Sequence, residues 1–137
     1  VLNLPEVPES LIIVGAGAIG LELGDFFGMM GSKITIVEAA PHIAPTEDAD
    51  IAKEMDRVQS KAGRTCITGV MAKSLVTKDG QAELTLGDGR VLTASKALVA
   101  VGRTPNTAGL DCEKAGCTLK RRGFVYVNDH LEPAEGG

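Results

Sequence analysis

The 137-residue sequence has very few aromatic side chains: no tryptophan, one tyrosine and three phenylalanines. A domain so poor in rings has to build its core from aliphatic side chains, as buried parallel sheets do. Three cysteines are too few for a disulfide-held scaffold, and the two histidines lie far apart in the sequence. We therefore expect neither a disulfide scaffold nor a metal site.

Long apolar runs and clusters of basic residues are also missing. The longest apolar runs, such as residues 11–14 and 98–101, are far shorter than the roughly 20 residues that cross a bilayer. Basic residues gather only at 120–122, and the formal net charge is −4. The sequence therefore predicts no membrane partner and no nucleic-acid partner.

Both ends of the sequence read as segments outside a folded domain. Residues 1–10 contain Pro5 and Pro8 and are interpreted as a linker, and residues 132–137 as a tail. Residues 11–131 then form one domain of ordinary size, and we expect the chain to be a piece of a longer protein. Since it starts without a basic and apolar leader, a cytoplasmic location is expected, or the mitochondrial matrix in a eukaryote.

The first half of the sequence alternates strand and helix patterns. Continuous apolar runs at 11–14 and 34–37 predict strands buried on both faces. Apolar residues at helical spacing predict helices over 19–30, which stops at Gly31, and over 48–62. The predicted apolar faces are Ile19, Leu23, Phe26, Phe27 and Met30 in the first helix, and Ile51, Met55 and Val58 in the second. This alternation indicates a βαβ unit and a parallel sheet.

The second half predicts short strands joined by tight turns. The expected strands are 65–70, 72–77, 82–86, 90–92, 97–101 and 124–127. The three from 72 to 92 alternate and are separated by turn residues, which is typical of an antiparallel meander. The expected fold is therefore α/β: a Rossmann-like parallel sheet with flanking helices and an antiparallel three-stranded β-meander.

Glycine is abundant, with 17 of 137 residues, and three glycines form the motif Gly15-x-Gly17-x-x-Gly20 between the first strand and the first helix. Gly15 would allow a tight turn, Gly17 would let a pyrophosphate approach the backbone, and Gly20 would let the helix pack closely on the sheet. With Ala16 and Ala18, these residues present backbone amides at a positive helix end. The motif predicts a dinucleotide-binding loop.

Glu38 follows the second predicted strand, where a carboxylate can accept hydrogen bonds from the adenosine ribose. The same charge repels a 2′-phosphate, and no arginine follows in the next four residues. The sequence therefore predicts NAD(H) rather than NADP(H). Plain turn glycines and a solvated strand-end Glu38 are the alternatives.

Three segments carry a resemblance to a known family: the run from Gly15 through Glu22 to Gly24, the end of the second strand at Glu38, and residues 100–106. In these segments the sequence resembles the flavin-dependent pyridine-nucleotide disulfide oxidoreductases, most nearly the dihydrolipoamide dehydrogenases. The resemblance extends over residues 5–131. It implies the NAD domain of a homodimeric flavoenzyme whose FAD and dimerisation domains lie outside this chain. FAD would then be bound by the full-length parent, which exchanges hydride between NAD(H) and FAD, and not by this fragment alone.

The same resemblance implies four further cofactor-binding residues. Ile19 and Glu22 would lie near the nicotinamide, Val70 against the adenine, and the backbone of Gly102 would line the nicotinamide pocket. The alternatives are a surface role for Glu22, core roles for Ile19 and Val70, and a turn at Gly102.

The cysteines do not supply the family's redox disulfide. Cys112 and Cys117 have its spacing, but they lie in a segment that resembles a structural loop near the end of the NAD domain, so we interpret them as incidental small apolar residues. Cys66 is predicted to be a buried core thiol. No catalytic residue is predicted, and we expect the fragment alone to be inactive.

Other functions stay open at this point. The parent could be a mercuric reductase, an NADH oxidase or peroxidase, or a ferredoxin reductase, and the chain could also be a non-catalytic nucleotide-binding module. A single-domain dehydrogenase is disfavoured, because the only tyrosine, Tyr126, is followed four residues later by His130 rather than lysine.

Overall fold

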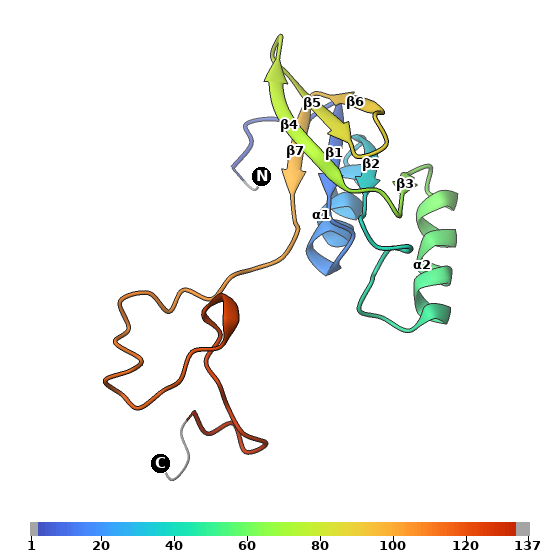
Figure 1. Cartoon of the computed structure of the whole chain (residues 1–137). Helices are drawn as coiled ribbons and strands as arrows, with labels where there is room; N and C mark the ends of the chain where they lie inside the picture. The colour runs from blue at the N-terminus through green and yellow to red at the C-terminus, as the bar shows by residue number, and fades with distance from the viewer. Residues whose placement is uncertain (1–2, 134–137) are drawn as a thin grey trace. The chain divides into compact units, whose positions relative to one another are not determined.

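The computed structural model describes residues 3–133 and divides the chain into two compact units, Val1–Val101 and Gly102–Gly137 (Figure 1). No helix in the described part of the chain is long and apolar enough to cross a membrane. Part of the predicted tail, residues 134–137, and the first two residues of the predicted linker lie outside the described residues. The domain limits 11–131 stay a prediction.

A four-stranded parallel sheet forms the centre of the first unit. Its strands are β1 (Ser10–Val14), β2 (Lys33–Val37), β3 (Thr65–Ile67) and β7 (Lys96–Val99). The strand order is β3-β2-β1-β7, with every pair parallel. The predicted parallel sheet is thus confirmed, and its order reverses direction at β1, the place where open α/β sheets bind ligands.

Two helices accompany this sheet, α1 (Ala18–Met29) and α2 (Ala49–Lys61), with α2 beside β3 (Figure 1). The helices are confirmed, and their predicted apolar faces are confirmed only in part: Phe27 is buried, and Met55 packs against the core as a partly buried residue. The buried residues are Gly20, Leu21, Gly24 and Phe27 in α1, and Ala52 and Gln59 in α2. Ile19, Phe26 and Met30 are about half exposed, because small residues rather than large ones bring α1 close to the sheet.

The second sheet is antiparallel and consists of β4 (Ala72–Lys78), β5 (Gln81–Leu86) and β6 (Val91–Ala94), in the order β4-β5-β6. Leu84 and Leu86 of β5 pack with Ile12 and Val14 of β1 in one core cluster. Leu11 and Ile13 point the other way, into a cluster with Leu21 and Phe27 of α1. Successive residues of a strand face opposite sides, so the meander and α1 cover opposite faces of the parallel sheet.

Two strands end earlier than predicted. The third strand ends at Ile67 instead of residue 70, because Gly69 turns the chain and its amide donates to the Ala40 carbonyl at 2.7 Å. The strand predicted at 97–101 is β7, which ends at Val99.

Over residues 102–133, the second unit contains one short 3-10 turn, η1 (Arg121–Gly123). The strand predicted at 124–127 is wrong: only a single bridge joins Val125 to Leu119. Within the described part of the chain, no neighbouring strand forms a continuous series of backbone hydrogen bonds with these residues. Their preference for the extended conformation is therefore not enough to produce a sheet.

Arg64 joins the far end of α1 to the start of β3. Its guanidinium forms an ion pair of 2.7 Å with Asp25 of α1, and only 8% of its side chain is exposed. It also donates to the Gln59 side chain at 2.9 Å. The Asp25 side chain is 48% exposed, but its removal would leave the buried Arg64 guanidinium without its ion-pair partner.

Candidate functional site: a glycine loop at the carboxyl ends of parallel strands

The glycine motif forms the connection between β1 and α1. Gly15 leaves the strand with a φ of +104°, and a Cβ atom there would collide with the carbonyl oxygen of Ala100. Its amide donates to the Val37 carbonyl at 2.8 Å. Gly15 is therefore required both by its backbone conformation and by the close approach of the chain that follows β7.

Gly20 has a different reason to be glycine. A Cβ atom at this position would collide with the carbonyl oxygen of Gly15, and it would also lie 3.3 Å from the Ile13 Cγ2 methyl group. One turn later, a Cβ atom at Gly24 would lie 3.0 Å from the Ile13 Cδ1. The first turns of α1 therefore lie directly against β1, as the motif predicted.

Glu38 holds the loop from the end of β2. One carboxylate oxygen accepts the Ala16 amide at 2.7 Å, and the other accepts the Ala40 amide at 2.8 Å. The Glu38 backbone is fixed as well, because its amide donates to Ile67 and its carbonyl accepts from Val70. These bonds orient the carboxylate towards the loop and leave further lone pairs on both oxygens for other donors.

Gly17 is the part of the loop that stays open. It is the N-cap of α1, and a Cβ atom there would meet nothing within 4 Å. The first amides of a helix have no partner inside it, and Gly17 has no side chain to cap them. The first turn of α1 also contains no acidic residue of its own, so no side chain of this turn competes with an anion for the helix end. The residues present fit a pyrophosphate group.

The structure brings most of the predicted residues together around this loop. Ala18, Ile19 and Glu22 are exposed on the first turns of α1, and Val70 is half-buried beside Glu38. Gly102 is exposed and opens the second unit.

Sequence reasoning missed the backbone groups that support the loop. The Ala44 amide donates to the Ala16 carbonyl at 2.9 Å, and Ala44 itself has a φ of +48°. The carbonyl oxygen of Ala100 leaves no space for a side chain at Gly15, and the Ala40 amide orients the Glu38 carboxylate. Because these contacts use main-chain atoms of alanine, no side-chain signal in the sequence could reveal them.

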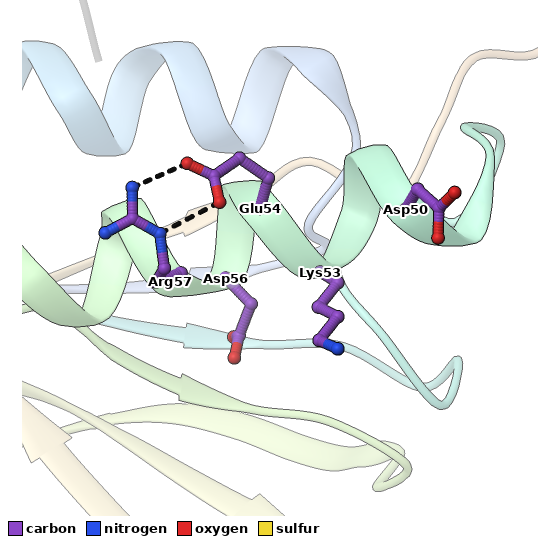
Figure 2. A pocket seen from close by; sticks show the side chains of 5 residues that line it. All are labelled: Asp50, Lys53, Glu54, Asp56 and Arg57. Atoms are coloured by element: carbon purple, nitrogen blue, oxygen red, sulfur yellow. Dashed lines mark hydrogen bonds and ion pairs between the residues drawn. The ribbon is translucent and has the colours of Figure 1, made fainter.

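A shallow hollow lies on the exposed surface of α2 (Figure 2). Its lining consists of Asp50, Lys53, Glu54, Asp56 and Arg57. Hydrogen bonds from the Arg57 guanidinium, at 2.6 and 2.8 Å, hold the pKa of Glu54 below its usual range. Exposed pairs of this kind contribute little to stability, and we assign no function to this hollow.

Cys66, predicted to be a buried core thiol, lies on β3, is half-buried and packs against the core cluster. Burial raises the pKa of this thiol above its ordinary value of 9.0, and the charge of Asp56 acts in the same direction. Since the thiolate is the reactive form, we expect iodoacetamide at pH 8 to modify Cys66 more slowly in the folded chain than in urea, as measured by peptide mass spectrometry. Equal rates in the two states would contradict this environment.

The same shift has a consequence for stability. A pKa that is higher in the folded state favours folding below the unfolded value and loses that contribution as the pH rises through the folded value. The free energy of unfolding should therefore fall more steeply above about pH 9 in the wild type than in Cys66→Ser, as measured by urea titration.

Comparisons with known proteins agree with this geometry. The family model described as pyridine nucleotide-disulphide oxidoreductase matches residues 1–136. A mitochondrial dihydrolipoyl dehydrogenase of Arabidopsis thaliana is 39% identical over 135 residues, which are 95% of this chain and 27% of that protein. The dihydrolipoyl dehydrogenase of Mycobacterium tuberculosis is 38% identical over 134 residues, 96% of this chain and 29% of the other.

Two solved structures share the fold over most of the chain. LpdA from Mycobacterium tuberculosis gives a TM-score of 0.83 at 32% identity, covering 92% of this chain and 28% of that one. The flavoprotein disulfide reductase RclA from Escherichia coli gives 0.86 at 35% identity, covering 98% and 30%. The chain thus spans less than a third of the length of these relatives.

Proposed function

Because this chain belongs to the pyridine nucleotide-disulphide oxidoreductase family, we propose that it is the part of such an enzyme that binds NAD(H). The observation on which this proposal depends is the pairing of Glu38 with the open glycine loop. The carboxylate lies at the edge where the strands of a parallel sheet end, and it is bonded to the Ala16 amide at 2.7 Å. The loop that is proposed to bind the pyrophosphate thus lies next to the carboxylate that is proposed to bind the ribose.

In this proposal the loop holds the pyrophosphate. Gly17 leaves room for it, and the amides of Ala18, Ile19 and Gly20 at the start of α1 donate to its oxygens. Gly15 and Gly20 set the path of the loop, and Ala16 is held by Glu38 and Ala44. The loop is already fixed by these bonds, so little ordering has to accompany binding.

Glu38 accepts the ribose hydroxyls and excludes a 2′-phosphate. Ile19 and Glu22 face solvent on the first turns of α1 and are proposed to lie towards the nicotinamide, with Val70 towards the adenine and Gly102 beside the nicotinamide. NADH, when bound, supplies a hydride. The described residues of this chain bind and orient the cofactor, and we assign none of them to a chemical step.

For the whole protein we propose hydride exchange between NAD(H) and FAD in a homodimeric dihydrolipoamide-dehydrogenase-like enzyme. This chain corresponds to 27–30% of the length of relatives with that name, and we propose that FAD is bound by other parts of the parent. We propose a cytoplasmic or mitochondrial-matrix location, since a mitochondrial protein and bacterial proteins are both among the relatives.

A calorimetric titration of the 137-residue chain with NADH and with NADPH tests the proposal. We expect saturable binding of NADH with one site per chain and much weaker binding of NADPH. We also expect no lipoamide reduction by the chain alone. Absence of NADH binding to a folded chain, or equal binding of both nucleotides, would contradict the proposal.

The charge of Glu38 should decide between the two nucleotides. Glu38→Arg is expected to move the preference towards NADPH by at least tenfold, about 1.4 kcal/mol, because a repulsive charge becomes an attractive one. The ratio of the two dissociation constants is the measurement. Glu9→Arg makes the same change of charge on an exposed residue just before β1 begins, at the opposite edge of the sheet, and should leave the ratio unaltered.

A further inference from the structure

The two cysteines of the second unit lie at the ends of one tight turn. The Ala115 amide donates to the Asp111 carbonyl at 3.2 Å, which makes one turn of helix. Gly116 then adopts a φ of +75°, the left-handed conformation in which many helices end. The turn between the cysteines is therefore a helix terminus, although it is too short to count as a helix.

Two hydrogen bonds define this terminus. The Gly116 amide donates to the Glu113 carbonyl at 3.0 Å, and the Cys117 amide donates to the Cys112 carbonyl at 2.8 Å. This nested pair is the Schellman motif, in which the side chains of the first and sixth residues commonly contact each other. In this turn the first residue is Cys112 and the sixth is Cys117.

Covalent geometry then limits the distance between the cysteines. A hydrogen bond of 2.8 Å between the Cys112 carbonyl and the Cys117 amide keeps their Cα atoms within about 7 Å of each other. Disulfides join Cα atoms that are usually about 4.4–6.8 Å apart. Both residues are free thiols and only partly buried, so a reagent can reach them.

We propose that Cys112 and Cys117 form a dithiol site that low-molecular-weight disulfides, such as oxidised glutathione, convert into a disulfide within this turn. One thiolate attacks the reagent, forms a mixed disulfide and releases one thiol. The second thiolate attacks the protein sulfur of that mixed disulfide, closes the bond and releases the other thiol. The protein loses two electrons and two protons, and the reagent is reduced to two thiols.

This site differs from the family's redox disulfide, which the resemblance places in another domain. It also replaces the interpretation of these cysteines as incidental apolar residues. In the reduced turn the Cys117 Sγ lies 3.9 Å from the Ala115 carbonyl. A thiol is a weak donor, so this contact does not prevent the side chain from turning towards Cys112.

The test is an oxidation of the full chain by oxidised glutathione, followed by intact-mass and peptide mass spectrometry. We expect the wild type and Cys66→Ser to lose two hydrogen atoms and to give a peptide cross-linked between Cys112 and Cys117. Cys112→Ser and Cys117→Ser should not form this link and should gain glutathione on the remaining cysteine of the turn. Stable addition of two glutathiones to Cys66→Ser would show that the thiols do not meet and would overturn the proposal.

A second variant tests the geometry itself. Gly116→Ala places a side chain at a positive φ, which alanine adopts at a cost. It should weaken the turn and lower the equilibrium constant for disulfide formation several-fold in a glutathione redox buffer. Gly109→Ala is the matched control, since Gly109 also has a positive φ, of +81°, but lies outside the turn. Equal constants for Gly116→Ala and Gly109→Ala would contradict the assigned role of the turn.

Discussion

Replacing Gly17 with valine is expected to abolish NADH binding while the fold survives. A Cβ atom at Gly17 meets no protein atom within 4 Å, and the residue has an ordinary extended backbone, with φ −75° and ψ −179°. The branched side chain would instead fill the space proposed for the pyrophosphate. We expect a loss of affinity of at least 100-fold, about 2.7 kcal/mol, in a calorimetric titration.

Two controls make this result specific. Gly87→Ala adds a Cβ atom in the turn between β5 and β6, where the nearest neighbour is the Met71 carbonyl oxygen at 3.4 Å, and should bind NADH as the wild type does. The circular dichroism spectrum and urea midpoint of Gly17→Val should stay close to those of the wild type. Unchanged affinity in folded Gly17→Val would show that the phosphates do not approach this residue.

Replacing Gly20 with alanine is expected to destabilise the fold strongly. Helix propensity alone would favour alanine by up to about 1 kcal/mol. The new Cβ atom, however, would collide with the carbonyl oxygen of Gly15, a backbone atom that cannot move without breaking the loop. We expect steric overlap to dominate and to lower the free energy of unfolding by about 3 kcal/mol or more, as measured by urea denaturation.

Gly24→Ala is the matched comparison in the same helix. Its Cβ atom would meet the end of the Ile13 side chain at 3.0 Å, and this side chain can rotate away, so a smaller loss is expected. If Gly20→Ala proved as stable as the wild type, the close contact between α1 and the loop would be wrong. A small domain has only about 5–15 kcal/mol of stability, so the difference is easily measured.

The parts of the site that depend on backbone geometry could be predicted from the sequence. Gly15 and Gly20 are forced to be glycine by the backbone atoms around them, and Glu38 follows directly from the end of a buried strand. Such constraints restrict the residue type at single positions, so they can be recognised in the sequence. The pairing of the Glu38 carboxylate with the Ala16 amide could not be read, because an alanine amide has no signature in a sequence.

The points at which the predicted fold differs from the structure also have physical causes. A hydropathy pattern counts large apolar residues, so it assigned Phe26 and Met30 to the buried face of α1, while glycines bring that helix to the sheet. The predicted strand at 124–127 has suitable residues, but a strand needs a neighbour, and the structure pairs only Val125. Which residues of a helix are buried, and whether a segment becomes a strand, thus depend on the neighbouring elements and not on local sequence preference alone.

Crystals of the chain soaked with NADH provide the strictest test of cofactor binding at the glycine loop. We expect electron density for the pyrophosphate over residues 15–20 at the start of α1, with the adenosine ribose hydroxyls within hydrogen-bonding distance of the Glu38 carboxylate. Density for the dinucleotide at any other place, with this loop empty, would contradict this expectation.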